Sequence, residues 1–486
     1  MKKIVLALIL MIAITLFGAA NLHAATVTWD GSEGNDWSTG ANWDTGSVPV
    51  GKDVVIIPGS AATMPHVNET TPKYASIEIQ SGASLSIDNA DDFTSGDTGD
   101  QIIAGDGSKP EVAAAAVAGL LKTDAMDVKS GGTLSMSAGE LQVATTFVVT
   151  GTFSGSGRYT VTFNGTVNQT IPDIKHSTVK IDKSSGTASL STNMTGAALT
   201  LTHGTFSTTT SNYSVDISGS LSGSGTLSAN NSTFNIGASW SHTGTINGTP
   251  TVTFDGTSAG NISSGGTART FKAMTVNKGN NTAQITLQGN LNVTNNLTIT
   301  RGQLNTNSTN NRTVDVDGDL AVSTNGTFEP NASAVHIFGA LTVDGTLTEA
   351  TCTFHFEGDD DMDLPDEGFH SITVNKGDAA ATVSLTAATS LRGDLTIISG
   401  TCDTVASSNH ALDLDGDLDI QASGSFMASN SAISVGGDLT RTGSLSQGNS
   451  TFTFDNGASS QDIAGGTYWN VVLDTHEQAS VNFQAA

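Results

Sequence analysis

The feature that most constrains how this chain can fold is an internal repeat of roughly 95–100 residues, which runs from about Gly151 to the end of the sequence. One recurring segment carries an aromatic residue just before a polar turn. Its successive copies lie 91, 102 and 98 residues apart, at Phe163, Phe254, Phe356 and Phe454. A second recurring segment alternates apolar and acidic residues before a glycine, as in Val314-Asp315-Val316-Asp317-Gly318. A repeat of this length describes either a string of small domains or several coils of one solenoid.

A shorter spacing of apolar residues inside the repeat distinguishes between these two folds. Apolar, strand-like positions recur every 17 to 23 residues, at Phe356, Val374, Ile397, Leu414, Val435 and Phe454. Turns rich in Gly, Asn, Asp or Ser follow them, and no regular Asn-Gly or Asp-Gly hairpins join long alternating strands. Coils of roughly 20 residues, stacked about 4.8 Å apart, match this rhythm. The sequence therefore predicts an all-β fold, a right-handed parallel β-helix, with tandem β-sandwich domains as the alternative.

The N-terminus has the order of segments that is typical of a secretory signal peptide. Lys2 and Lys3 are followed by an uncharged apolar run from Ile4 to Phe17, and then by small residues up to Ala24. The run is shorter than the roughly 20 residues that cross a bilayer. We therefore expect residues 1–24 to be removed on export, which leaves a secreted or cell-surface protein without a membrane-spanning segment.

Residues 25–150 are predicted to form a capping module with the first coils, and residues 151–486 the repetitive β-helix. The module holds three of the five tryptophans, in Trp29-Asp30-Gly31, Trp37 and Asn42-Trp43, ahead of the strand-like run Asp53-Val54-Val55-Ile56-Ile57-Pro58. This arrangement resembles the opening of bacterial secreted and autotransporter-like β-helix surface proteins. The resemblance implies an exported, adhesin-like protein. One helix is predicted, from Pro110 to Leu121, with Ser108 near its capping position.

The last copy of the repeat is incomplete. It continues through Tyr468-Trp469-Asn470 and stops at Ala486, and no segment after Val472 resembles a polar cap, a membrane-spanning barrel or a sorting tail. Solenoid ends usually carry a cap, because they expose strand edges. We therefore expect the natural chain to be longer, with more coils and an anchoring segment.

The charge balance bears on partners. The chain has 46 acidic residues against 19 Lys and Arg, and a formal net charge of −27. Such a charge repels nucleic acid and anionic membranes and keeps an elongated surface protein dispersed. We expect a monomer whose partners are an extracellular surface, a matrix or a polysaccharide.

The sharpest candidate site is a set of outward positions on consecutive coils. Asp315, His336 and His355 each precede an inward apolar residue, so the coil register places them in one ladder at roughly 5 Å spacing. Two imidazoles and a carboxylate can bind zinc or a similar ion. The alternative is coincidence, because other copies of the repeat carry Asn235 and Thr253 at the two histidine positions.

Two other features suggest chemistry less directly. The acidic motif at Asp315, Asp317 and Asp319 resembles a calcium loop, but its alternate residues are strand valines and no bidentate Glu follows. Solvated acids explain it better, and calcium is the one cofactor that it suggests. Cys352 and Cys402 occupy different points of the coil, so we expect buried free thiols and no disulfide.

Two common catalytic motifs are absent from the sequence, which contains no His-Glu-x-x-His and no phosphate-binding loop. We therefore expect a non-catalytic structural or adhesive protein. The alternatives are a carbohydrate-active β-helix enzyme, and a glycan-binding protein whose sugar stacks on Trp29, Trp37 and Trp43.

Overall fold

A computed structural model describes the chain after its first 24 residues, with gaps. The described residues are 25–50, 53–67, 76–80, 83–87, 92–94, 101–104, 113–117, 120–130, 132–136, 138–155, 158–173, 175, 177–266, 268–348, 350–405, 407–455, 460–474 and 480–484. The expected signal peptide lies outside these residues. Strand accounts for 55% of the chain and helix for 1%, which makes the protein nearly all β.

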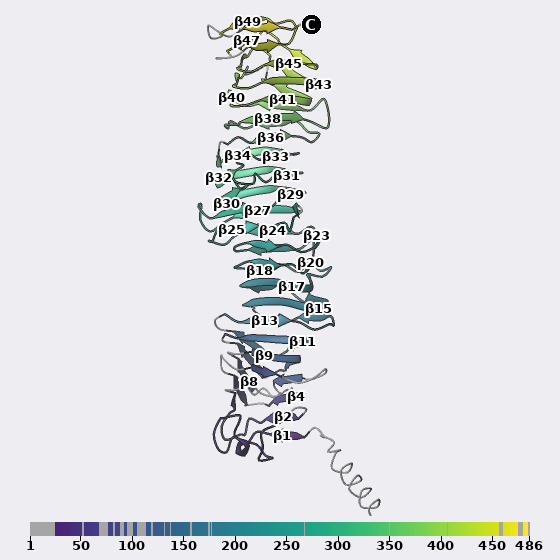
Figure 1. Cartoon of the computed structure of the whole chain (residues 1–486), viewed down its shortest axis with the longest axis vertical. Helices are drawn as coiled ribbons and strands as arrows, with labels where there is room; N and C mark the ends of the chain where they lie inside the picture. Colours follow the sequence, from purple (N-terminus) through teal and green to yellow (C-terminus); the bar gives the residue numbers. More distant parts are fainter. Residues whose placement is uncertain are drawn as a thin grey trace, which may run out of the picture. The chain divides into compact units, whose positions relative to one another are not determined.

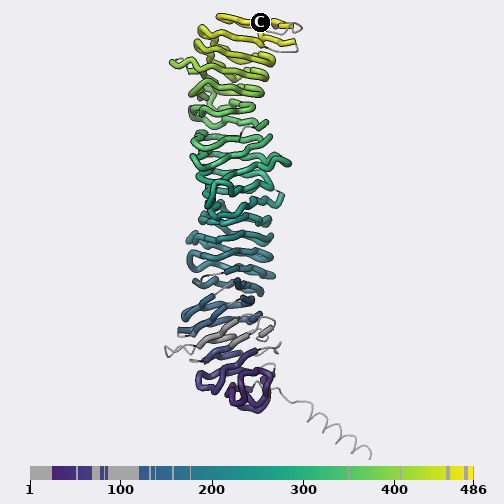
Figure 2. The backbone as a smooth tube through the Cα atoms, turned by 90° about the vertical axis from the view of Figure 1, so that its left-hand side faces the viewer, coloured from purple at the N-terminus to yellow at the C-terminus, as the bar shows by residue number. Residues whose placement is uncertain are grey.

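The chain is a parallel β-solenoid, as predicted. Its coils form about 17 turns spaced about 21 residues apart. Among the described residues, each strand pairing whose direction is defined is parallel, which excludes the β-sandwich alternative because sandwiches are built from antiparallel strands. The chain divides into two compact units, with the boundary between Ser177 and Thr178. Figure 1 labels the strands, and Figure 2 shows the stacked coils within each unit.

The first unit contains two stacks of parallel strands. One stack comprises β1 (Thr26–Thr28), β2 (Val54–Ile57), β4 (Ser76–Ile79), β7 (Gln101–Ala104), β9 (Leu120–Val128), β11 (Glu140–Val149) and β13 (Thr160–Phe163). The other comprises β3 (His66–Val67), β5 (Ser84–Ile87), β8 (Ala113–Val117), β10 (Gly132–Met136) and β12 (Thr152–Gly155). Three short elements complete the unit: the 3₁₀ turn η1 (Gly40–Asn42), β6 (Asp92–Thr94) and β14 (Gln169–Ile171).

One prediction for this unit needs correction. The helix predicted from Pro110 to Leu121 is wrong: its central alanines form strand β8, which pairs with β5 and β10. Pairing with a coil on either side outweighs the helix propensity of alanine. The division into two units after Ser177 is one of contacts, and the predicted change from a capping module to the repetitive β-helix after residue 150 stays a prediction.

The second unit holds the remaining strands. Its first half contains β15 (Thr178–Leu190), β16 (Met194–Gly196), β17 (Ala198–Ser207), β18 (Val215–Ile217), β19 (Leu221–Gly223), β20 (Thr226–Asn230), β21 (Thr233–Ile236), β22 (Trp240–His242), β23 (Ile246–Gly248), β24 (Thr251–Phe254), β25 (Gly260–Ile262), β26 (Arg269–Phe271), β27 (Ala273–Asn277), β28 (Gln284–Leu287), β29 (Leu291–Val293), β30 (Leu297–Asn305), β31 (Val314–Val316) and β32 (Leu320–Glu329). Its second half contains β33 (Ala334–Ile337), β34 (Leu341–Val343), β35 (Thr346–Leu347), β36 (Thr353–Phe356), β37 (Met362–Leu364), β38 (Ser371–Asn375), β39 (Thr382–Leu385), β40 (Thr389–Leu391), β41 (Leu395–Asp403), β42 (Leu412–Leu414), β43 (Leu418–Met427), β44 (Ala432–Val435), β45 (Leu439–Arg441), β46 (Ser444–Ser446), β47 (Thr451–Phe454), β48 (Gln461–Ile463), β49 (Asn470–Leu473) and β50 (Val481–Phe483). No helix among the described residues is long and apolar enough to cross a membrane.

In this unit the sequence repeat and the structural turn have different lengths. Val316 and Leu414 are equivalent residues 98 apart, whereas a turn takes about 21 residues, so one repeat makes roughly four and two-thirds turns. We call a series of strands that pair from coil to coil a column. Equivalent strands of successive repeats lie in different columns: β18 in β18–β21–β24–β27, β31 in β31–β33–β36–β38, and β42 in β42–β44–β47–β49. Each repeat is thus rotated by about a third of a turn relative to the one before.

This rotation corrects one step of the predicted coil register. The 17-residue step from Ile397 to Leu414 is not a full turn, because Ile397 pairs with Ile420 and Leu414 pairs with Leu391. The steps from Phe356 to Val374 and from Val374 to Ile397 are turns, as predicted. Strand β41 spans two columns, so the chain passes from one column to the next without a change in its apolar pattern.

The predicted core is confirmed. The phenylalanines Phe163, Phe254, Phe356 and Phe454 have no exposed surface, and neither do the inward valines Val314 and Val316. Alternation along each short strand buries one face, and the stack joins these faces into a continuous apolar interior within the unit.

Asparagine closes the same turn in all three repeats. Asn212, Asn311 and Asn409 adopt left-handed backbone conformations, with φ of 56°, 47° and 54°. The side-chain oxygen of Asn311 accepts a hydrogen bond from the backbone N–H of Ala332 in the next coil, at 3.2 Å, and the other two make the equivalent bond at 3.0 Å. Asn, like Asp, combines tolerance of positive φ with a local acceptor.

A lysine also recurs in three repeats, and the sequence pattern did not indicate that it is buried. Lys183, Lys278 and Lys376 are 0–2% exposed. The ammonium of Lys278 donates to the carbonyl of Gly237, at 2.8 Å, and burial lowers the pKa of Lys183 to about 8. Gly302 covers the stem of Lys278 at φ +91°, where an added Cβ would lie 2.7 Å from the lysine Cγ.

Candidate functional site

The candidate ladder lies on the outer face of three neighbouring strands. Strands β31, β33 and β36 pair in parallel, and their register places Asp315 beside His336 and His336 beside His355. The residues that flank each histidine, such as Val335 and Ile337, are fully buried, so alternation turns the imidazoles outward. The register predicted for this ladder is therefore confirmed.

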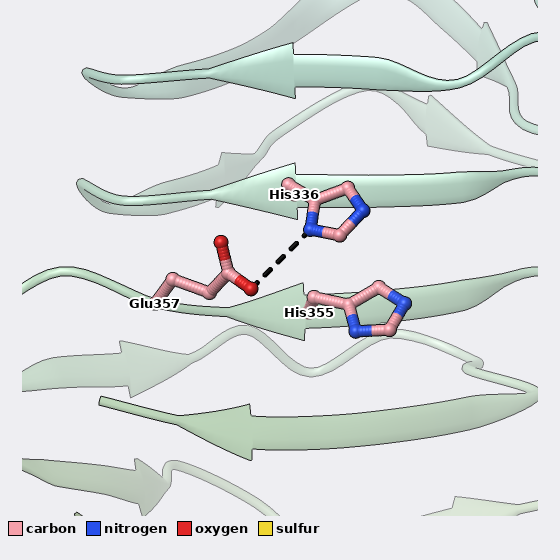
Figure 3. Close-up of side chains that lie close together, drawn as sticks. All are labelled: His336, His355 and Glu357. Carbon is pink, nitrogen blue, oxygen red and sulfur yellow. Dashed lines mark hydrogen bonds and ion pairs between the residues drawn. The ribbon is translucent and has the colours of Figure 1, made fainter. Parts of the chain in front are cut away.

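The two imidazoles stack on each other. Their ring centroids are 4.3 Å apart and their planes differ by 9°. The carboxylate of Glu357 approaches from the same coil as His355, and its Oε1 lies 3.3 Å from Nδ1 of His336. Figure 3 shows this arrangement, with Glu357 reaching diagonally toward the neighbouring coil. We call His336, His355 and Glu357 the histidine cluster.

The electrostatic setting of the cluster is acidic. Burial raises the pKa of the Asp315 carboxyl and Asp317 raises it further, while His336 opposes both. Burial lowers the pKa of His355, His336 lowers it further, and Glu357 opposes them. One carboxylate oxygen of Asp315 is shielded from solvent and has no hydrogen-bond partner among the described residues. The cluster thus places imidazole nitrogens beside carboxylates.

Chemically, the histidine cluster consists of groups that could hold a metal ion. One ligand atom from each of its three residues can be chosen so that all lie within 4.8 Å of one another. The sequence predicted the two histidines and missed Glu357, because this residue was assigned to the turn after the strand. The period of two along a strand was the available signal, since it places residues 355 and 357 on the same face.

The three tryptophans are not available to a sugar. Trp29, Trp37 and Trp43 are 0–2% exposed and pack on one another, with ring centroids 4.7 to 6.2 Å apart. The indole N–H of Trp29 donates to the carbonyl of Thr63, and that of Trp43 to the carbonyl of Trp37. The hypothesis that these rings stack on a ligand is wrong, because they form the core of the segment around β1 and β2.

The acidic motif serves the turns of the solenoid. The carboxylate of Asp394 accepts a hydrogen bond from the backbone N–H of Asp417, Asp417 does the same for Asp438, and Asp438 for Asp462, at 2.7 to 2.9 Å. Asp319 accepts from Ala340 in the same way. These four acids therefore each satisfy a main-chain donor of the next coil.

Both cysteines are buried and carry free thiols, as expected. Burial raises the pKa of Cys352 to about 11 and that of Cys402 to about 12. They behave as small apolar residues of the core.

A second polar cluster borders an open hollow of about 630 Å³. Nδ1 of His203 lies 2.8 Å from the carboxylate of Asp182, and Lys180 lies 3.1 Å from the same carboxylate. The hydrogen bond with His203, followed by that with Lys180, lowers the pKa of Asp182. Asp182 is the one carboxylate among the described residues that line the hollow.

No family model, curated protein or solved structure matches this chain.

Proposed function

We propose that this chain is an exported, non-catalytic structural or adhesive protein that displays an extended β-solenoid surface, similar to bacterial autotransporter-like surface proteins. The observation that carries the proposal is how the side chains of the second unit are used. Recurring Asn and Asp residues in the turns bond to the main chain of the next coil, and recurring apolar residues fill the interior. The repeated residues thus maintain a long, regular surface, which is what a scaffold requires.

The acidic composition suits this role. A formal charge of −27 disfavours anionic membranes and nucleic acid, and it directs the search for partners toward neutral glycans, cationic matrix proteins and host or neighbouring cell surfaces.

The test is a binding screen with residues 25–486. The purified chain is coupled to fluorescent beads and applied under flow to a glycan array and to immobilised matrix proteins. The control is the same chain unfolded by heat, which keeps the composition and charge but loses the solenoid. Retention that requires the folded chain supports the proposal. Equal retention of folded and unfolded chain, or no retention on any surface, contradicts it.

The second candidate is a carbohydrate-active enzyme, and the observation in its favour is the hollow beside Asp182 and His203. Hydrolysis of a glycosidic bond uses two carboxyl groups on opposite sides of the bond, whereas the described lining of this hollow supplies one. A reducing-sugar assay on a polysaccharide panel separates the two functions. Release of reducing ends that is lost in Asp182→Asn would replace the scaffold proposal with the enzymatic one.

A further inference from the structure

We propose that His336, His355 and Glu357 bind one divalent transition-metal ion of the zinc type, with the Asp315 carboxylate beside them. This site does not depend on the adhesive role, because it rests on the local geometry of three coils.

The spacing of the ligand atoms favours a metal. A tetrahedral ion with bonds of about 2.0–2.1 Å needs ligand atoms roughly 3.4 Å apart. The pair formed by His336 Nδ1 and Glu357 Oε1 is already at 3.3 Å, and the whole set lies within 4.8 Å. The adjustment that remains would fall on the His355 side chain, which is partly exposed on the outer face.

A second, independent observation comes from Asp315. Its Oδ1 is shielded from solvent and lacks a hydrogen-bond donor among the described residues, although buried carboxylate oxygens normally have one. The carboxylates that influence it, Asp317 and Glu357, carry the same charge. A cation at the histidine cluster would offset this accumulation of negative charge.

The ligand types decide the class of ion. Two imidazole nitrogens and one carboxylate suit zinc, cobalt, nickel or copper, whereas calcium and magnesium prefer sets made of oxygen atoms alone. Three protein ligands leave a fourth position of a tetrahedral ion for Asp315, water or an external ligand.

The neighbouring repeats provide a matched comparison inside the same chain. The equivalent ladders read Asp216–Asn235–Thr253 and Asp413–Ser434–Thr453. Ser434 donates to Asp455 at 2.7 Å, in the same diagonal geometry as His336 and Glu357. The scaffold of the site is therefore repeated, and the imidazoles distinguish this copy. For the same reason, His336→Asn with His355→Thr introduces side chains that this fold already accommodates.

The experiment is calorimetric titration of residues 25–486 with zinc chloride, nickel chloride and calcium chloride. We expect one equivalent of zinc and of nickel to bind, a loss of affinity of at least 100-fold in the His336→Asn/His355→Thr variant, and about 10-fold or more in Glu357→Gln. Cobalt added to the native chain should give the visible absorption of a tetrahedral site. His410→Gln, a histidine outside the cluster, should bind as the native chain does.

A gain-of-function variant keeps the test decisive. Asn235→His with Thr253→His copies the imidazoles into the preceding repeat, where Asp255 takes the place of Glu357, and should add a second equivalent of zinc. Weak binding of several equivalents, binding that survives the double substitution, or calcium bound as tightly as zinc would each overturn the proposal.

Discussion

Replacing Asn311 tests how the turns hold one coil against the next. Asn311→Ala puts alanine, which has a Cβ but no side-chain hydrogen-bond acceptor, at a position with φ of 47°. It also removes the hydrogen bond from the backbone N–H of Ala332. The left-handed conformation costs such a residue about 1–2 kcal/mol, and the lost hydrogen bond costs about 1 kcal/mol. We expect local opening to become easier by about 2–3 kcal/mol, which corresponds to roughly 30- to 150-fold faster hydrogen exchange.

The assay is hydrogen–deuterium exchange of the backbone amides of β33, which pair with β31 and do not use Asn311 as their acceptor. Asn311→Gly relieves the backbone and loses only the acceptor, so exchange should rise about 5-fold. Asn311→Asp keeps both properties and should stay within about 3-fold of the native chain. Amides of β44, in the next repeat, provide the internal control. Equal exchange in the Ala and Gly variants would refute the role of positive φ, and an Asp variant as fast as Ala would refute the role of the acceptor.

Three further predictions concern the interior. Phe356→Ala should lower stability by about 3–5 kcal/mol, seen as a lower denaturant midpoint, because the ring is fully buried; a change below 1 kcal/mol would contradict the assigned register. Cys352 and Cys402 should react with a thiol reagent only after unfolding, because burial raises their pKa values to about 11 and about 12; rapid labelling of the native chain would show that the core is open. Burial lowers the pKa of His242, and Arg269 lowers it further, while the hydrogen bond to the carbonyl of Gly225, at 2.8 Å, opposes them. As the pH drops below about 6.5, the unfolded chain therefore binds this proton before the folded chain does. The free energy of unfolding should fall with it. Melting at pH 7.5 and pH 5 should show a smaller loss in His242→Gln than in the native chain, and an unchanged loss would assign the acid sensitivity to other groups.

The local pattern predicted most of the strands but not how they stack. Alternation in Val314-Asp315-Val316 is decided by burial of one face, so the inward and outward residues could be assigned from the sequence. The step from Ile397 to Leu414 could not be assigned from the sequence. A strand that continues into the next column has the same apolar spacing as a strand that begins a new coil. Only the pairing of distant segments distinguishes these two cases.

The residues of the candidate site show the same limit. His336 and His355 were placed correctly because both lie inside strands of regular period. Glu357 lies one residue beyond β36, where the sequence reads as a turn, and its approach to His336 depends on the relative position of two coils. The burial of Trp29, Trp37 and Trp43 likewise arises from their mutual packing, which composition does not reveal.

The rotation of successive repeats determines how often equivalent side chains recur along one column of strands, and therefore how many of them a partner can contact. Equivalent side chains return to one column only after three repeats, which is about 14 turns or roughly 65–70 Å of stacked coils. A rigid ligand lying along a single column of the second unit would therefore meet each motif once, and would bind with the affinity of one contact rather than with avidity. A flexible polymer that winds around the solenoid, such as a long glycan, could engage three copies at successive intervals of about 20–25 Å. The sequence repeat thus favours partners that wrap over partners that align.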